Sequence, residues 1–88
     1  METIKLNRKA GNEAYEKALN DAIEYAKKCA EKGIEYPTIN FWAPTYIIGS
    51  KVKEALKNVG VVCQESGFGS DKNIDGSYDF RIKCRIVE

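Results

Sequence analysis

The sequence predicts a two-layer α+β sandwich, in which a mainly antiparallel sheet of three to four strands carries two helices on one face. Two observations lead to this prediction. The hydrophobic patterns follow the order strand, helix, strand, helix, strand, strand, and the long first helical pattern is apolar along one face only. The chain has 88 residues, 43% of them hydrophobic, which is enough for one modest core, so residues 1–88 are expected to form a single domain.

The first strand pattern spans residues 2–7, where Ile4 and Leu6 alternate with polar side chains. We expect this short strand to be half-buried and paired in the sheet. A helix is predicted to begin after Asn12, whose side chain can accept from the free amides of the first turn, and to end at Gly33, which suits the left-handed position after a helix.

Two prolines, Pro37 and Pro44, limit regular structure in the middle of the chain, because each disfavours a helical residue before it. Between them the sequence predicts a short strand with Ile39 and Phe41 facing the core. Alternation turns the tryptophan that follows to the opposite side.

A second helix is predicted to end at Gly60, and the sequence leaves two alternatives for its start. Ser50 is a suitable N-cap. Thr45 is an earlier one, and a start there would place Gly49 in the middle of the helix, where glycine weakens it.

Strand patterns at residues 61–66 and 77–87 complete the chain. In the second of these, apolar and charged side chains alternate, as in a strand with one buried face. Asp75 and Gly76 are a hairpin turn signal between the two strands, and residues 67–77 are expected to form a loop.

Charge and composition exclude several classes of function. The net charge of +1 gives no long-range field that would attract a polyanion. The chain has no histidine, and Cys29, Cys63 and Cys84 are widely spaced, so we expect buried free thiols, with a Cys63–Cys84 bridge as the less favoured alternative. No apolar run approaches the length of a membrane span and no signal peptide is recognised, so a cytoplasmic protein without a cofactor is expected.

Catalytic chemistry finds little support in the sequence. Without histidine, a serine or cysteine nucleophile lacks its usual base. The carboxylates of Glu65, Asp71, Asp75 and Asp79 are expected to be solvated turn residues. The glycine-rich stretch GFGS precedes neither a phosphate-binding lysine nor a helix, so no nucleotide motif is present. We therefore predict that the chain is not an enzyme.

The stretch DKNIDGSYDF begins in the way a calcium-binding loop begins. Its alternate oxygen ligands would be Asp71, Asn73, Asp75 and Asp79. The twelfth position should be a glutamate and is Ile82, and the flanks are a glycine-rich loop and a strand instead of helices. A plain hairpin loop is the favoured interpretation, and weak calcium binding is the alternative.

A nucleic-acid interface is the main alternative function. The stretch from Gly49 to Val62, a serine cap and a lysine-rich helix that runs into a hairpin, resembles the recognition helix and wing of winged-helix proteins. The resemblance implies that this helix enters the major groove while the wing contacts the backbone. The phosphate contacts would come from four lysines: Lys51, Lys53, Lys57 and Lys72. The prolines at 37 and 44 stand where that fold needs a regular second helix.

The last strand carries a basic row, Arg81, Lys83 and Arg85, on one side. On an uncovered sheet face, this row could contact phosphates or an acidic protein, and nearby aromatic side chains could stack on RNA bases. Protection of an edge strand by exposed charges is the alternative role.

We favour a non-catalytic protein-binding module: a small regulator, adaptor or inhibitor, encoded on this view by a phage or mobile element. Its expected surface combines the proline-flanked segment NFWAPTY with the loop at 67–77, since rigid exposed aromatic side chains are frequent hot spots. The candidate contact residues are Phe41, Trp42, Tyr46 and Phe68, with Trp42 and Tyr46 as anchors. The other interpretation, which is the favoured one for this residue, places Trp42 over one end of the core, because a small domain can hardly spare a lone large aromatic side chain. Exposed edge strands also leave a homodimer open.

Overall fold

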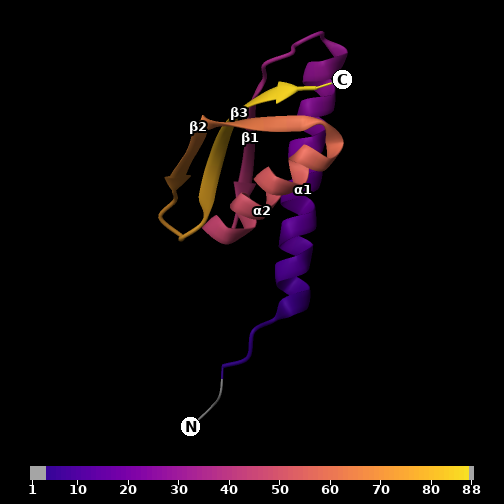
Figure 1. Cartoon of the computed structure of the whole chain (residues 1–88). Helices are drawn as coiled ribbons and strands as arrows, with labels where there is room; N and C mark the ends of the chain where they lie inside the picture. Colours follow the sequence, from indigo (N-terminus) through magenta and orange to yellow (C-terminus); the bar gives the residue numbers. More distant parts are fainter. Residues whose placement is uncertain (1–3, 88) are drawn as a thin grey trace.

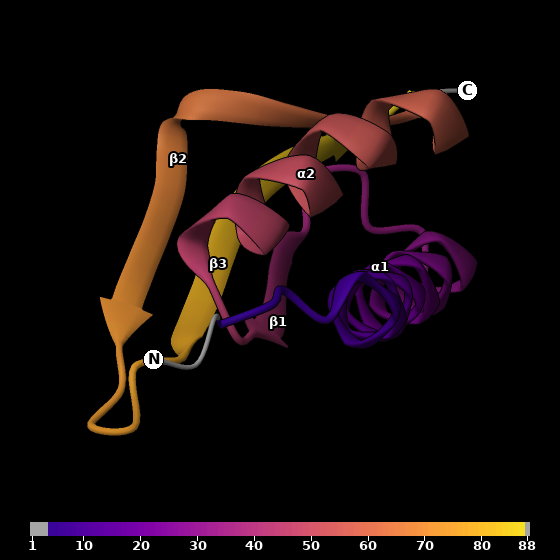
Figure 2. The ribbon, with the colours of Figure 1, turned by 90° about the horizontal axis from the view of Figure 1, so that it is seen from below.

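The computed structural model describes residues 4–87, with all of their side chains except those of residues 65 and 66. The regular elements follow in this order: α1 (Arg8–Glu31), β1 (Thr38–Ala43), α2 (Tyr46–Leu56), the 3-10 turn η1 (Lys57–Val59), β2 (Val61–Lys72) and β3 (Tyr78–Ile86). Within the described residues, three strands form one antiparallel sheet in the order β1-β3-β2. In Figure 2, α2 lies over the sheet and α1 lies beside α2 along β1, which confirms the predicted two-layer α+β sandwich.

The predicted first strand is wrong for the part of it that the structure describes. Residues 4–7 form no strand, and the side chains of Ile4 and Leu6 are 97% and 78% exposed. The remainder of that predicted strand lies outside the described residues. The cause is an earlier helix start than predicted, because Asn7, and not Asn12, caps α1 by accepting a backbone N–H of the first turn at 3.0 Å.

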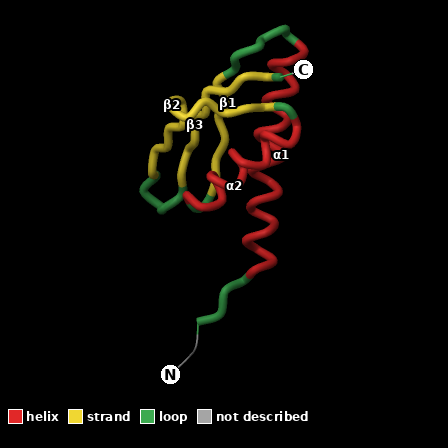
Figure 3. The backbone as a smooth tube through the Cα atoms, viewed as in Figure 1, coloured by secondary structure: helices red, strands yellow, loops and turns green. Residues whose placement is uncertain are grey.

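The contact of α1 with the rest of the fold depends on small side chains. Ala18, Ala22 and Ala26 are buried at intervals of about one turn, so the helix can approach its neighbours closely. Larger side chains of α1 flank this row and pack against the core: Tyr15, Leu19 and Ile23. The N-terminal part of α1 extends past the end of the sheet (Figure 1), and the chain before it leads further away as a loop (Figure 3).

Alternation along the strands gives the sheet one face under the helices and one open face. Under the helices, Phe80 is fully buried and stacks on Phe41 and Phe68, with ring centroids 5.1 and 5.5 Å apart. The open face carries the exposed alternate positions of β1 and β3: Thr38, Asn40, Trp42, Asp79, Arg81, Lys83 and Arg85. Polar and charged side chains therefore dominate the face that the helices leave uncovered.

α2 begins at the earlier of its two predicted caps. The Thr45 hydroxyl oxygen accepts the Ile48 N–H at 3.2 Å, so Gly49 lies inside the helix, where it is buried. A Cβ atom at this position would collide with the ring of Phe80. The glycine is therefore explained by the close approach of α2 to the sheet.

β2 and β3 form a long hairpin, and the predicted loop at 67–77 is shorter than expected. Residues 67–72 continue β2, because Phe68 pairs with β3 and packs its ring against the core. The strand reaches this position through a shift in register within β2. The turn itself is limited to residues 73–77, with Gly76 at φ 90°, in agreement with the Asp-Gly turn signal.

The structure departs from winged-helix proteins in the region where the sequence predicted a departure. Residues 38–43 form β1, so the described chain holds only α2 and the short η1 between the first two strands. The lysine-rich helix α2 packs on the sheet through Val52 and Leu56, both fully buried. The similarity is thus confined to one helix followed by a hairpin.

Gly49→Ala is expected to destabilise the fold by about 2 kcal/mol, as overpacking of a core does, because the new methyl group meets Phe80. Gly11→Ala is the matched control, since it also lies in a helix but its Cβ would meet nothing within 4 Å. Better helix propensity should make that variant more stable by about 0.5–1 kcal/mol. Urea unfolding followed by circular dichroism measures both, and equal free energies of unfolding for the two variants would contradict this packing.

Candidate functional site

Trp42 lies on the open face of the sheet, and its side chain is 45% exposed. It stands opposite Asp79 of β3 in the antiparallel register. Its neighbour Phe41 points the other way, is only 5% exposed and stacks in the core. The prediction that Phe41 contacts a partner is therefore wrong, because the same alternation that exposes Trp42 buries Phe41.

A hydrogen-bond network around Ser77 holds Trp42 in place. The indole Nε1–H of Trp42 donates to the Ser77 hydroxyl oxygen at 2.9 Å, and the Asn73 side-chain amide donates to the same oxygen at 3.0 Å. The Ser77 hydroxyl in turn donates to Asp75 Oδ1 at 2.6 Å. Ser77 is 5% exposed, so a buried hydroxyl connects the tryptophan to the β2–β3 turn. Backbone hydrogen bonds of the turn also fix Ser77, because the Asn73 N–H donates to the Ser77 carbonyl at 2.8 Å and the Gly76 N–H to the Asn73 carbonyl at 3.0 Å.

The carboxylate of Asp75 belongs to this network. It accepts from the hydroxyl and also from the backbone N–H of Ser77, the latter at 3.0 Å. These hydrogen bonds, the one from the side chain first, lower the pKa of Asp75 below its ordinary value. The group is therefore a carboxylate at neutral pH, close to the indole but exposed to solvent.

The calcium interpretation finds no ligand cage in the described part of the chain. Asp75 is engaged by Ser77, and Asp71 accepts from Arg81 at 3.0 Å. Among the described residues no group of three or more carboxylates, cysteines or histidines is placed to hold a metal ion. Asn73 points its amide nitrogen, which is not a metal ligand, at Ser77. The segment is a hairpin turn closed on itself, with Asp79 left beside Trp42 on the strand.

The open face is hollowed beside Trp42. The hollow has a volume of about 440 Å³ and lies between the tryptophan and polar side chains of all three strands: Asn40 of β1, Asp71 of β2, and Asp79 and Arg81 of β3. The Arg81 guanidinium is paired with Asp71, which leaves the carboxylates of Asp79 and Asp75 as the excess charge around the indole. A large aromatic surface with a mainly acidic rim results.

The two other predicted contact residues lie on the helical side of the sheet. Tyr46, 46% exposed at the start of α2, packs edge-on against Phe68 and Tyr78 with centroids 5.9 and 5.8 Å apart. Phe68 is partly buried in the core, with the Lys53 ammonium 4.8 Å above its ring. Trp42 and Tyr46 thus flank the same end of the molecule from opposite faces and do not form one flat surface.

The basic residues of the nucleic-acid interpretation are divided in the same way. Lys51, Lys53 and Lys57 belong to α2 and η1 in the helical layer, whereas Arg81, Lys83 and Arg85 project from the open face. Lys72 ends β2, next to the turn. Several of these charges have acidic neighbours: Lys57 with Glu54 at 3.5 Å, Arg81 with Asp71 at 3.0 Å and Arg85 with Glu35 at 3.5 Å. No continuous basic surface is formed by the two sets.

A second exposed aromatic side chain shares the open face with Trp42. Backbone hydrogen bonds from Ile86 to Glu35 and from Cys84 to Pro37 extend the pairing of β3 beyond β1. Tyr36 therefore comes opposite Arg85, whose guanidinium lies 5.8 Å from the ring. The open face thus carries an aromatic side chain at each end of β1.

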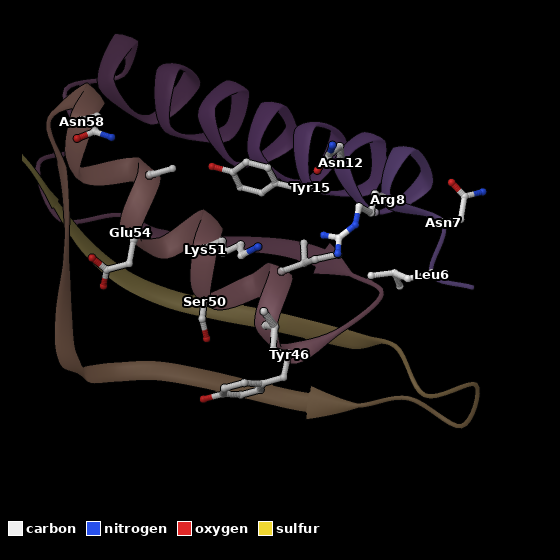
Figure 4. Close-up of a pocket in the computed structure, with 14 residues that line it drawn as sticks. Leu6, Asn7, Arg8, Asn12, Tyr15, Tyr46, Ser50, Lys51, Glu54 and Asn58 are labelled. Atoms are coloured by element: carbon white, nitrogen blue, oxygen red, sulfur yellow. The ribbon is translucent and has the colours of Figure 1, made fainter. Parts of the chain in front are cut away.

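The sequence did not predict a groove of about 850 Å³ between the N-terminal half of α1 and α2 (Figure 4). Tyr15 and Arg8 project from α1 towards α2, and Lys51 projects from α2 into the same space. Ile47, 69% exposed, lies on its α2 side. Ile47 is the residue that could have indicated this groove, because it is apolar but does not belong to the buried stripe of α2.

Cys63 and Cys84 are free thiols that lie directly opposite each other on β2 and β3. Burial raises the pKa of both thiols, for Cys84 to about 12. Both are therefore protonated at neutral pH and are poor nucleophiles. Cys63 and Cys84 act as small apolar side chains in the core, and Cys29, which is partly buried, does so to a lesser extent.

The comparisons leave the site to be interpreted from its own geometry. No family model, no curated protein and no solved structure matches the chain. Across residues 4–87, neither helix combines the length and the apolar character that crossing a membrane requires.

Ser77→Ala is expected to release Trp42 and to raise the pKa of Asp75 towards its ordinary value, because both lose their hydrogen bonds to the hydroxyl. Lost bonds at a buried site should cost about 1–2 kcal/mol of stability. The pKa of Asp75 is lower in the folded chain than in the unfolded chain, so its hydrogen bonds stabilise the fold at pH values above the unfolded pKa. This stabilisation is lost as the pH falls through the folded pKa. NMR titration of Asp75 measures the shift, and an unchanged titration would contradict the network.

Alkylation by iodoacetamide at mildly alkaline pH should modify Cys29 first, because Cys63 and Cys84 are buried and their thiols stay protonated. We expect these two to react at least roughly 100-fold more slowly than Cys29 in the folded chain. Mass spectrometry of the peptides measures the rates. The same reaction in concentrated urea is the control and should bring the three rates together; equal rates in the folded chain would contradict the burial of the pair.

Proposed function

We propose that the chain is a non-catalytic intracellular protein-binding module, a small regulator, adaptor or inhibitor, and that it binds its partner through the open face of the sheet around Trp42. One observation carries the proposal: a half-exposed indole is held in one position by a buried hydroxyl. Tryptophan is enriched among the residues that dominate binding energy at protein interfaces. Free thiols at all three cysteines suit a reducing compartment.

The position of Trp42 lowers the cost of binding. Its indole N–H already has an acceptor in Ser77, so a partner that covers the ring does not strand a polar group. The side chain is also held before binding, which reduces the rotamer entropy lost in the complex. Alanine in place of Ser77 would remove both advantages while leaving the ring itself in the chain.

The charges around Trp42 indicate what the partner carries. Asp79 stands opposite the ring, Asp75 is held ionised two hydrogen bonds away, and Arg81 is already occupied by Asp71. A lysine or arginine side chain of the partner would meet these carboxylates and could lie over the indole as well. We therefore propose a protein partner that presents a basic side chain next to an apolar one.

Single-stranded nucleic acid is the competing ligand for the same face. Two exposed aromatic side chains, Tyr36 and Trp42, share the face with the basic row of β3, which is the arrangement that base stacking would use. Against this stands the pairing of Arg81 and Arg85 with carboxylates, together with the acidic rim of Trp42. Phosphates would meet a surface of nearly balanced charge, so the protein partner is better supported.

Trp42→Ala is expected to weaken capture of the partner from native lysate by about 2 kcal/mol or more, equivalent to roughly a 30-fold loss of affinity, as hot-spot truncations do. Tyr25→Ala is the matched control, since Tyr25 is also about 40% exposed but lies on α1. Nuclease treatment should not change the result. With the purified partner, emission from Trp42, the one tryptophan of the chain, should shift on binding.

Two outcomes would contradict the proposal. Equal capture by the Trp42→Ala and Tyr25→Ala variants would exclude Trp42 as the anchor. Capture that disappears with nuclease would instead assign the open face to nucleic acid.

A further inference from the structure

β2 forms an outer edge of the sheet, and alternate residues of its second half turn their backbone groups away from β3. The Asn73 N–H donates to the Ser77 carbonyl at 2.8 Å, so these two residues are a hydrogen-bonded pair of the hairpin. Hydrogen-bonded pairs alternate along an antiparallel ladder, so residues 69 and 71 point their backbone groups at β3. The outward residues are Phe68, Ser70 and Lys72.

The other side of β3 gives the same assignment. Cys84 and Ile86 donate their N–H groups on the β1 side, to the carbonyl oxygens of Pro37 and Glu35 at 2.9 and 2.8 Å. Neighbouring residues of a strand point their backbone groups to opposite edges, so residue 81 turns its own towards Gly69 of β2. In the part of the chain that the structure describes, no further strand and no turn hydrogen bond reaches the outward groups of β2.

This edge lacks the protection that exposed strands usually have. α1 lies along the opposite edge strand, β1, whereas β2 lies on the side away from α1 (Figure 2). Natural edge strands are shielded by proline or by lysine within the strand. Residues 68–72 contain no proline and have a lysine only at their end, and the other charge, Asp71, is paired with Arg81. Ser70 is exposed, although it lies on the helical side of the sheet.

We propose that β2 pairs antiparallel with β2 of a second copy of this chain, about a twofold axis that passes through Ser70 perpendicular to the sheet. Ser70 then stands opposite Ser70 of the other copy, and Phe68 opposite Lys72, so each outward residue meets an outward residue. Each of these pairs exchanges two backbone hydrogen bonds, about six in all. The methylene stem of Lys72 covers the partly buried ring of Phe68.

The charges on the open face select this register. Pairing about Ser70 places Asp71 of the other copy opposite Gly69, which stands next to Arg81 on β3. The Cα atoms of Arg81 and that aspartate are then two strand spacings apart, about 10 Å, which their side chains span together. Each arginine thus lies between two aspartates around the axis. A register two residues nearer the turn would instead place the two Asp71 side chains directly opposite, where like charges repel.

The arrangement explains Gly69. Its φ is not positive, and a Cβ there would lie 3.7 Å from the Arg81 carbonyl oxygen, which is an ordinary contact. No contact within the chain therefore requires a glycine. In the dimer, any side chain at this position would stand between Arg81 and Asp71 of the other copy. The dimer leaves Trp42 free on the far strand β1, so it does not depend on the proposed function.

Sedimentation velocity of the full chain between about 1 µM and about 1 mM tests the proposal. We expect a monomer–dimer equilibrium that Ser70→Pro weakens at least roughly 10-fold, because proline removes the N–H that donates across the axis. The proline breaks no bond to β3, since that N–H points outward. Ser70→Ala is the matched control and should dimerise normally, because it keeps the N–H. Equal weakening by both variants would contradict backbone pairing.

Ser70→Cys tests the register itself. Opposite residues of a hydrogen-bonded pair have Cα atoms about 5.5 Å apart, a distance that a disulfide spans. With glutathione disulfide as the oxidant, Ser70→Cys should therefore link to Ser70→Cys of the other copy. Ile74→Cys, fully exposed in the β2–β3 turn, should stay unlinked at the same concentration.

Mass spectrometry of the peptides identifies the link and separates it from the native cysteines. Three results would overturn the proposal: a monomer at all concentrations, a dimer that Ser70→Pro leaves intact, or equal linking of Ser70→Cys and Ile74→Cys. Because Trp42 takes no part in these contacts, loss of the dimer leaves capture of a partner through the open face as a separate question.

Discussion

The fold depends on the packing around Phe80, the fully buried residue at the middle of the sheet. Its ring meets aromatic rings from three other elements: Phe41 of β1, Tyr46 of α2 and Phe68 of β2. Gly49 lets α2 approach this ring more closely than any side chain would allow. One residue of β3 thereby determines how far the helix stands from the sheet and which face of each strand is buried.

The exposed site follows from that buried contact. Because Phe80 points towards the helices, Asp79 and Arg81 must point to the open face, and the antiparallel register brings Trp42 opposite Asp79. The turn that closes the hairpin then places Ser77 within hydrogen-bonding distance of the indole. A partner surface of this kind needs no loop to order on binding, since strands and a tight turn position its aromatic anchor.

Local patterns were sufficient to predict the layers, the second helix and the last strand. They left Trp42 between an exposed position and one over an end of the core, with the core favoured, whereas the structure exposes 45% of its side chain. They failed at the start of the chain, because Asn7 and Asn12 both suit a helix cap and the pattern at 4–7 resembles a strand even when no neighbour pairs with it. The contact of Trp42 with Ser77 joins residues 35 positions apart, and it depends on the register of β1 with β3. No spacing in the sequence carries that information.

The order parameter of the Trp42 indole N–H, measured by ¹⁵N relaxation in the free chain, tests most directly whether the open face holds a preorganised anchor. Its hydrogen bond to Ser77 predicts a value of about 0.85, as in rigid backbone. A value below about 0.6 would mean that the indole moves freely on the nanosecond timescale, and it would contradict the account of how this face binds.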